Sequence, residues 1–201
     1  MTVVHARPEQ EPQLIDVLVE SFAADPICNW MVRSDARRGQ AFRTFFQMWL
    51  RMRSFADGEV LTTEEGRSAF IWLPSSKLHA TFIQQLRSAS SVVSFTGWRQ
   101  VRRLLGFFDQ AAKQHPKEPH LYLQFLGVHQ EDRRKRVAAA LMNHVLSRAD
   151  REGLPCYAET SEPRNLDIWR RFGLLQTGEI LVDGAPPVWT MLRKPGASKT
   201  S

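Results

Sequence analysis

Several features common in other protein classes are scarce or missing in this 201-residue chain. Its two cysteines, Cys28 and Cys156, are too few for a metal site and form no CxxC spacing, so we expect reduced thiols, no bound metal and a cytoplasmic location. No run approaches the ~18 apolar residues that span a bilayer, and the first residues lack the apolar core of an export signal. A membrane protein is therefore not expected.

Repeats, low-complexity segments and linkers are also missing, and the composition is ordinary, with 43% hydrophobic and 24% charged residues. The length suffices for one well-filled core. We therefore predict a single domain over residues 1–195, followed by a flexible tail at 196–201, in a monomer or homodimer.

The net charge of +6 favours an anionic partner, which could be nucleic acid, an acidic lipid surface or a phosphorylated small molecule. Nucleic-acid binders interleave basic and aromatic residues along one face. Here the cations cluster in one loop, so we expect neither a nucleic-acid nor a membrane partner.

Hydrophobic periodicity predicts the order strand, helices, hairpin, helices, strand, helix, strand, helix and two strands, compatible with an α/β fold. Strands are expected at 2–7, around Glu65-Gly66, at 119–128 and 156–160, and around Asp183-Gly184; helices are expected within 9–22, 27–52, 77–114, 138–152 and 163–172. In the strand at 119–128, alternation places Leu121, Leu123 and Phe125 on one face.

The stretch "VHQEDRRKRVAAALM", from Val128 to Met142, joins a predicted strand to a predicted helix through four consecutive cations. A helix start presents unpaired backbone N–H groups and the positive end of the helix dipole, and this combination binds phosphate. A solvated, purely structural helix start is the alternative, and for a generic basic tetrad it is the more common one.

This region resembles the cofactor half of the GCN5-related N-acetyltransferases. Arg133 matches the first position of their Gln/Arg-x-x-Gly-x-Gly/Ala loop, Ala138 matches the last, and "PRN" at 163–165 matches the segment after their fifth strand. Stretches at 22–26, 115–119, 159–166 and 189–197 look like the puromycin N-acetyltransferases within that family. The resemblance implies a mixed sheet flanked by helices, with two central parallel strands splaying apart where acetyl-CoA inserts.

The activity implied by the resemblance is transfer of an acetyl group from acetyl-CoA to a primary amine of a small molecule by direct attack. The cofactor-binding residues that it implies are Leu126, Gly127, Val128, Arg133, Arg134, Lys135, Arg136, Val137, Ala138, Ala139 and Asn165. The alternative is a catalytically silent binding or regulatory protein of the same fold that has lost its cofactor.

Two departures from the family pattern bear on that choice. Arg136 replaces the central motif glycine and Arg134 an often-glycine position, and a non-glycine residue fits there if its backbone is right-handed helical and its side chain points outward. Trp169 stands where a tyrosine often protonates the departing thiolate, and indole donates a hydrogen bond but does not titrate.

The acceptor's ammonium must lose a proton before its nitrogen can attack, and this step calls for a base. Glu159, on the strand before "PRN", is the first candidate, although a structural ion pair is an equally common role for one such glutamate. His129 is the second candidate. A backbone N–H between Leu126 and Val128 is expected to polarise the carbonyl oxygen.

The acceptor pocket is the least determined part of the predicted site. Asp25, in "FAADP", is expected either to line it or to serve as a helix cap or turn residue. Trp30, Phe82, Trp98 and Phe108 either shape an apolar acceptor site or belong to the core.

Overall fold

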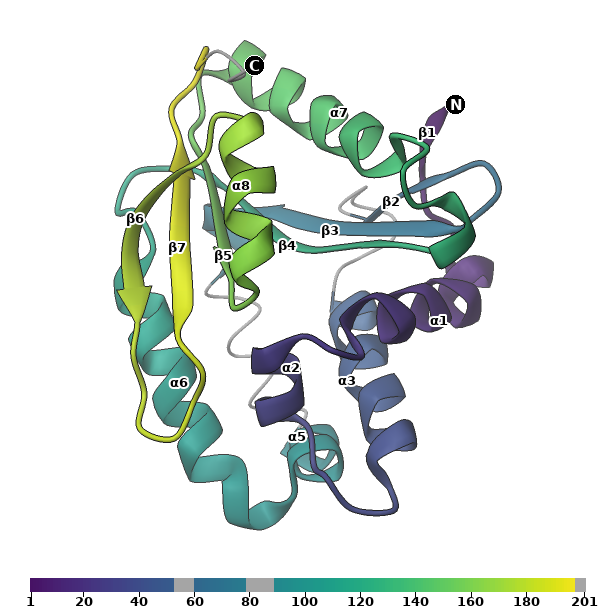
Figure 1. Ribbon diagram of the computed structural model, residues 1–201, viewed down its shortest axis with the longest axis vertical. Helices are drawn as coiled ribbons and strands as arrows, with labels where there is room; N and C mark the ends of the chain where they lie inside the picture. The colour runs from purple at the N-terminus through teal and green to yellow at the C-terminus, as the bar shows by residue number, and fades with distance from the viewer. Residues whose placement is uncertain (53–59, 79–88, 198–201) are drawn as a thin grey trace.

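The computed structural model describes residues 1–52, 60–78 and 89–197 (Figure 1). One mixed sheet runs through them in the order β1-β2-β3-β4-β5-β7-β6. Its strands are β1 (Val3–His5), β2 (Val60–Thr63), β3 (Ser68–Pro74), β4 (Leu121–Val128), β5 (Cys156–Thr160), β6 (Leu175–Ile180) and β7 (Val188–Arg193). β4 and β5 are parallel, and the other neighbours are antiparallel. The predicted α/β fold is confirmed.

Helices cover both faces of the sheet and define two cores (Figure 1). One face carries α1 (Glu11–Phe22), α2 (Pro26–Met31), α3 (Arg38–Met52), α5 (Ala89–Thr96) and α6 (Val101–Gln114); the other carries α7 (Val137–Glu152) and α8 (Pro163–Arg171). Short 3-10 turns are η1 (Pro8–Gln10), η3 (Ser75–Lys77), η4 (Trp98–Gln100) and η5 (Gln130–Asp132). Within the described ranges, no helix has the length and apolarity to cross a membrane.

The two parallel strands separate part of the way along the sheet. β4 pairs with β5 from Leu121 to Leu123, opposite Cys156 to Ala158, and the pairing goes no further. Beyond that point β4 continues along β3 to Val128, while β5 continues along β7 to Thr160. The predicted opening between the central strands therefore begins at Gln124 and Glu159.

A β-bulge at this branching point changes which face β4 presents. Ile71 of β3 pairs with Phe125 and Trp72 pairs with Leu123, so Gln124 is an extra residue in β4. One inserted residue reverses the alternation of side chains. Phe125 therefore packs into the core of α1 and α3, whereas Leu123 packs under α7, and the prediction that they share a face is wrong.

The C-terminal strand is anchored to the end of α7. Arg193 donates to both carboxylate oxygens of Asp150, at 2.6 and 2.9 Å, and the N–H of Gly196 donates to Asp150 at 2.7 Å. Residues 198–201 lie outside the described part of the chain, so the flexible tail stays a prediction.

Candidate active site

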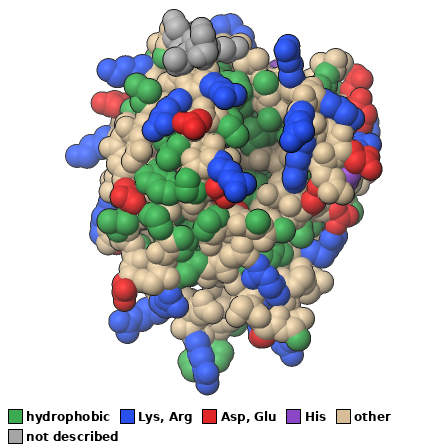
Figure 2. Space-filling model, viewed as in Figure 1, with side chains coloured by type: hydrophobic (Ala, Val, Ile, Leu, Met, Phe, Trp, Pro, Cys, Tyr) green, Lys and Arg blue, Asp and Glu red, His purple; other side chains and the backbone are tan. Residues whose placement is uncertain are grey.

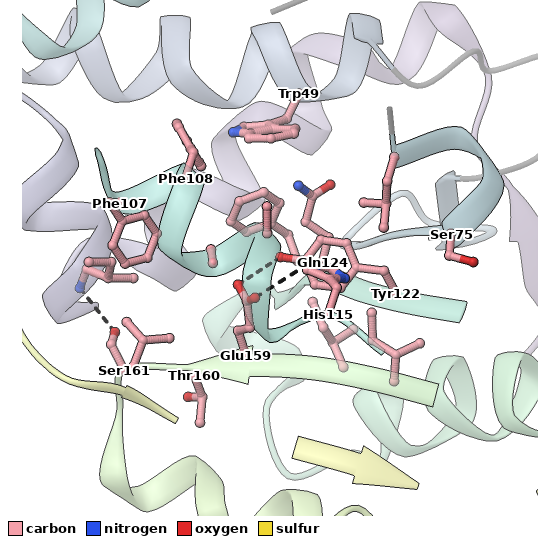
Figure 3. Close-up of a pocket in the computed structure, with 18 of the residues that line it drawn as sticks. Trp49, Ser75, Phe107, Phe108, His115, Tyr122, Gln124, Glu159, Thr160 and Ser161 are labelled. Atoms are coloured by element: carbon pink, nitrogen blue, oxygen red, sulfur yellow. Dashed lines mark hydrogen bonds and ion pairs between the residues drawn. The ribbon is translucent and has the colours of Figure 1, made fainter. Parts of the chain in front are cut away.

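A cavity of about 850 Å³ lies where β4 and β5 separate (Figure 3). Its apolar wall is aromatic, formed by Phe22, Phe45, Trp49, Phe107, Phe108 and Phe125. Its polar groups include Asp25, His115, Tyr122, Glu159, Ser161 and Asn165. Figure 2 shows a hollow on the face that Figure 1 presents, with Lys and Arg side chains near its rim. A cavity with an apolar wall and few convergent polar groups is the usual form of a small-molecule site.

Glu159 of β5 points into this cavity, where Tyr122 and His115 lie beside it (Figure 3). Both tyrosines of the chain are hydrogen-bonded to Glu159. The Tyr122 hydroxyl donates to its Oε2 at 3.1 Å, and the Tyr157 hydroxyl donates to its Oε1 at 3.0 Å. The side chain is 13% exposed. Burial raises the pKa of Glu159 to about 7, although the two phenol hydrogen bonds act in the opposite direction. A carboxyl with this pKa exchanges protons readily at neutral pH.

His115, just beyond α6, completes the polar cluster. Its ring lies 4.4 Å from the Tyr157 ring and 4.8 Å from the Tyr122 ring, measured between centroids. Its Nε2 lies 3.6 Å from Oε1 of Glu159, and its Nδ1 lies 3.2 Å from Nε2 of His120. Burial, with the neighbouring His120, lowers the pKa of His115 to about 4. His115 is therefore neutral at physiological pH.

The sequence did not reveal the roles of His115, Tyr122 and Tyr157. His115 belongs to "HPKEP" at 115–119, a stretch whose resemblance to known enzymes implies no chemical role for the ring. The scarcity of tyrosine was an available signal, because the chain has two, placed on the two strands that separate.

One backbone donor of β4 points into the opening. N–H groups alternate between the two sides of a strand. The His129 N–H donates to Arg67 on the β3 side, and the Val128 N–H donates to Ser21 Oγ at 3.1 Å. By alternation the Leu126 N–H points to the same side as the Val128 N–H. Of the backbone N–H groups between Leu126 and Val128, the one predicted to polarise the carbonyl oxygen is therefore that of Leu126.

The basic loop departs from its expected backbone. Arg134 and Arg136 have φ values of +66° and +63°, in the left-handed region that glycine adopts without strain. The right-handed backbone under which a non-glycine residue fits without strain is therefore not found at either position. Both side chains are exposed, as are those of Arg133 and Lys135.

The first turn of α7 supplies the donors of a phosphate site. α7 begins at Val137, and its first intrahelical hydrogen bond runs from the Ala140 N–H to the Arg136 carbonyl. The preceding N–H groups of Val137, Ala138 and Ala139 therefore have no acceptor within the helix. Asp132 pairs with Lys135 at 2.8 Å and keeps one cation at the start of the loop. The arrangement suits an anion.

Asp25 is a helix cap and also lies at the cavity, so its role toward an acceptor stays a prediction. It caps α2, accepting from the Cys28 N–H at 2.9 Å, and it also lines the cavity. The Ser161 hydroxyl lies 3.2 Å from each Asp25 oxygen, so the end of β5 is tied to α2. The cap holds Asp25 in place at the cavity wall.

The predicted aromatic residues lie in different places. Phe108 lines the cavity, whereas Trp30 packs 5.9 Å from Phe107 and lies one layer behind the wall. Trp98 is 73% exposed on the surface, so neither the core nor the pocket assignment holds for it. Phe82 lies outside the described residues.

His129 lies apart from Glu159. Its Nε2 is 3.5 Å from Glu20 and its Nδ1 is 3.2 Å from the Arg67 guanidinium, beside a separate shallow hollow. These partly exposed ion pairs around His129 suit a structural role for its ring at the end of β4.

Two residues of α8 line the side of the cavity opposite α1. Asn165 donates to Thr160 Oγ1 at 3.3 Å. The indole N–H of Trp169 is buried and, among the described residues, has no hydrogen-bond partner. Buried donors are rarely left unpaired, so this N–H is available to a ligand.

Residues 48–173 match the model of the acetyltransferase (GNAT) family. A Corynebacterium glutamicum structure described as "histone acetyltransferase HPA2 and related acetyltransferase" is 26% identical, with a TM-score of 0.72, covering 97% of this chain and 96% of that one.

Two eukaryotic structures share the fold. The polyamine N-acetyltransferase of Drosophila melanogaster is 16% identical, with a TM-score of 0.67, covering 96% of this chain and 99% of that one. Arylalkylamine N-acetyltransferase 2 of Aedes aegypti is 14% identical, with a TM-score of 0.62, covering 96% and 98%. These matches do not support the narrower likeness to puromycin N-acetyltransferases.

Proposed function

The chain belongs to the acetyltransferase (GNAT) family, and from that premise we propose that it transfers the acetyl group of acetyl-CoA to the primary amine of a small molecule by direct attack. The observation that carries the proposal is Glu159: a buried carboxyl with a pKa of about 7, inside a cavity that starts where β4 and β5 part. Such a group is suited to take the proton of an ammonium at neutral pH.

The residues present fit acetyl-CoA. Bound acetyl-CoA supplies a thioester, whose carbonyl carbon is open to attack and whose thiolate departs. The N–H groups at the start of α7 and the cations of the basic loop, Arg133 to Arg136, bind the phosphates. The unpartnered indole N–H of Trp169 and the Leu126 N–H supply donors along the opening.

Each group of the chain then has one task. Glu159 accepts the acceptor's proton, directly or through water. The Leu126 N–H stabilises the negative charge that develops on the carbonyl oxygen. Trp169 donates a hydrogen bond to the thiolate and does not protonate it. The attacking nitrogen loses a second proton as the amide forms, and since a thiol has a pKa of roughly 8.5, water can pass that proton to the thiolate.

We propose an acceptor whose amine is carried on an aromatic or bulky aliphatic body. The aromatic wall favours such a body, and the carboxyl groups of Asp25 and Glu159 favour a cation near it. A polyamine would place further ammonium groups against the aromatic wall at the cost of their hydration. Both acceptor types occur in names of proteins that share the fold.

The direct test measures release of free CoA thiol with acetyl-CoA and a panel of amines, including phenethylamine and spermidine. We expect the arylalkylamine to have the higher kcat/KM, and kcat/KM to rise through about pH 7 as Glu159 loses its proton.

Glu159→Gln should remove most of this turnover and the pH-dependent limb while leaving acetyl-CoA affinity unchanged in calorimetry. Glu179→Gln, the same change on the exposed face of β6, is the matched control. Full activity of Glu159→Gln would reject the assigned base. Absence of any acetyl-CoA binding would favour the silent GNAT-fold module instead.

We further propose that the protein works in the cytoplasm, as a monomer or homodimer, without nucleic-acid or membrane partners. Cys28 and Cys156 are buried free thiols, which supports a reducing compartment. Light scattering after size-exclusion chromatography gives the oligomeric state, and a membrane pellet or a mobility shift with DNA or RNA would contradict the rest.

A further inference from the structure

The ring nitrogens of two histidines next to Glu159 have defined proton positions. Nδ1 of His120 lies 2.8 Å from the backbone carbonyl oxygen of Glu118. A carbonyl only accepts hydrogen bonds, so this Nδ1 must carry a hydrogen. His120 is 2% exposed, and its burial lowers its pKa, which keeps the ring neutral. A neutral ring with a hydrogen on Nδ1 has a bare Nε2.

This assignment passes to the next ring. The bare Nε2 of His120 lies 3.2 Å from Nδ1 of His115, so the hydrogen between them belongs to His115. His115 is itself neutral, and its Nε2 is therefore bare. That bare nitrogen faces Oε1 of Glu159 at 3.6 Å.

We propose that the Glu118 carbonyl and His120 fix His115 in the tautomer that presents a bare Nε2 to Glu159, so that His115 acts as a positioning residue favouring the protonated carboxyl. The tautomer follows from the hydrogen-bond geometry and the neutrality of both buried rings, whereas its use in catalysis rests on the proposed acetyl transfer. When Glu159 holds a proton, the carboxyl O–H can turn toward Nε2. When Glu159 is ionised, its charge faces a lone pair.

The groups around Glu159 act on its protonation state in opposite directions. Tyr122 and Tyr157 donate to Glu159 and favour its ionised form, whereas burial and the bare Nε2 favour its protonated form. The other charged or titratable groups that line the cavity, among the described residues, are Asp25, Cys28, Asp109 and Lys117. With only the phenols in place, Glu159 would be a weaker base.

The unliganded protein offers the first test. Two-bond proton–nitrogen correlation spectra distinguish a bare ring nitrogen from a protonated one, and a His115→Phe spectrum assigns the His115 signals. At neutral pH we expect His115 with hydrogen on Nδ1 and none on Nε2. Hydrogen on Nε2, or on both nitrogens, overturns the proposal.

The second test releases the tautomer without touching Glu159. In His120→Phe the ring volume remains but the acceptor for His115 Nδ1 is gone, so His115 is free to place its hydrogen on Nε2 and donate to the carboxylate. We expect the midpoint of the Glu159 carboxyl titration, followed by carbon NMR and assigned with Glu159→Gln, to fall by about one pH unit, the equivalent of one hydrogen bond.

A double-mutant comparison separates this effect from general packing. In a His115→Phe background, the His120→Phe change should leave the Glu159 midpoint unchanged, because the ring that it acts through is absent. An equal shift in both backgrounds would overturn the proposal. These titrations need no acetyl-CoA, so they stand or fall separately from the acetyl transfer; in the active enzyme the kcat/KM limb should move with the midpoint.

Discussion

Arg136 offers a quantitative test of strain in the basic loop. Its φ of +63° places an L-residue with a Cβ in the left-handed region, which costs roughly 1–2 kcal/mol. Arg136→Gly removes that cost but makes the unfolded chain more flexible, which returns about 0.4–1 kcal/mol. The net expectation is a free energy of unfolding higher by about 1 kcal/mol, or ~2–4 °C in Tm for a chain of this size.

Arg136→Ala is the matched control, because it removes the same exposed guanidinium but keeps the Cβ and the strain. Urea unfolding of both variants, without ligand, isolates the backbone contribution. Acetyl-CoA affinity, measured by calorimetry, should be at least as high in Arg136→Gly as in Arg136→Ala, since the N–H donors of α7 remain. If the glycine variant is no more stable than the alanine variant, the strain argument is refuted.

Three further predictions address the site. Ala138→Glu should abolish acetyl-CoA binding, because its side chain crowds and repels the pyrophosphate. At a hundred times the dissociation constant, acetyl-CoA should stabilise the parent protein by about 2.7 kcal/mol in a thermal melt, and the variant should show no such stabilisation. A ligand-induced shift in the variant would contradict the phosphate site. Folding raises the pKa of Glu159 from 4.5 to about 7, so the contribution of this carboxyl to stability is full below pH 4.5 and is lost as pH rises through 7. The unfolding free energy of Glu159→Gln should therefore exceed that of the parent protein by up to ~3 kcal/mol at pH 8–9 and by little at pH 4. A difference that does not change with pH would contradict the raised pKa. Trp169→Phe should keep the fold and lower kcat by roughly tenfold, because the indole donor is lost. Trp169→Tyr should recover at least the kcat of the parent protein, and an unchanged kcat in Trp169→Phe would contradict the donor role.

The sequence predicted the order of elements because hydrophobic periodicity and turn residues are local signals. The helix that begins at Pro163 and the hairpin at Glu65-Gly66 are examples. The bulge at Gln124 depends on how β4 pairs with β3, which is distant in the sequence. No residue near Gln124 is a sequence signal for a bulge. The side-chain faces of β4 were therefore predicted wrongly beyond Leu123.

The candidate site divides in the same way. Glu159 was the first candidate for the base because it lies on the strand before "PRN", and the structure places it at the cavity, although its role as a base stays a prediction. His115 and Tyr122 meet Glu159 through tertiary packing across separate elements, which spacing along the chain does not encode. Tyr157 is different, because it lies two residues before Glu159 on β5 and strand alternation alone places both on one face. The backbone of Arg134 and Arg136 was missed because a non-glycine residue normally argues against left-handed geometry.

The pairing of Glu159 with both tyrosines of the chain also has a practical consequence. Uniform incorporation of 3-fluorotyrosine would label Tyr122 and Tyr157 and nothing else, because the sequence contains two tyrosines. Each phenol oxygen lies about one hydrogen bond from the carboxylate, at 3.1 and 3.0 Å. A fluorine spectrum of the whole protein would then contain signals from these two rings alone, both hydrogen-bonded to the Glu159 carboxyl.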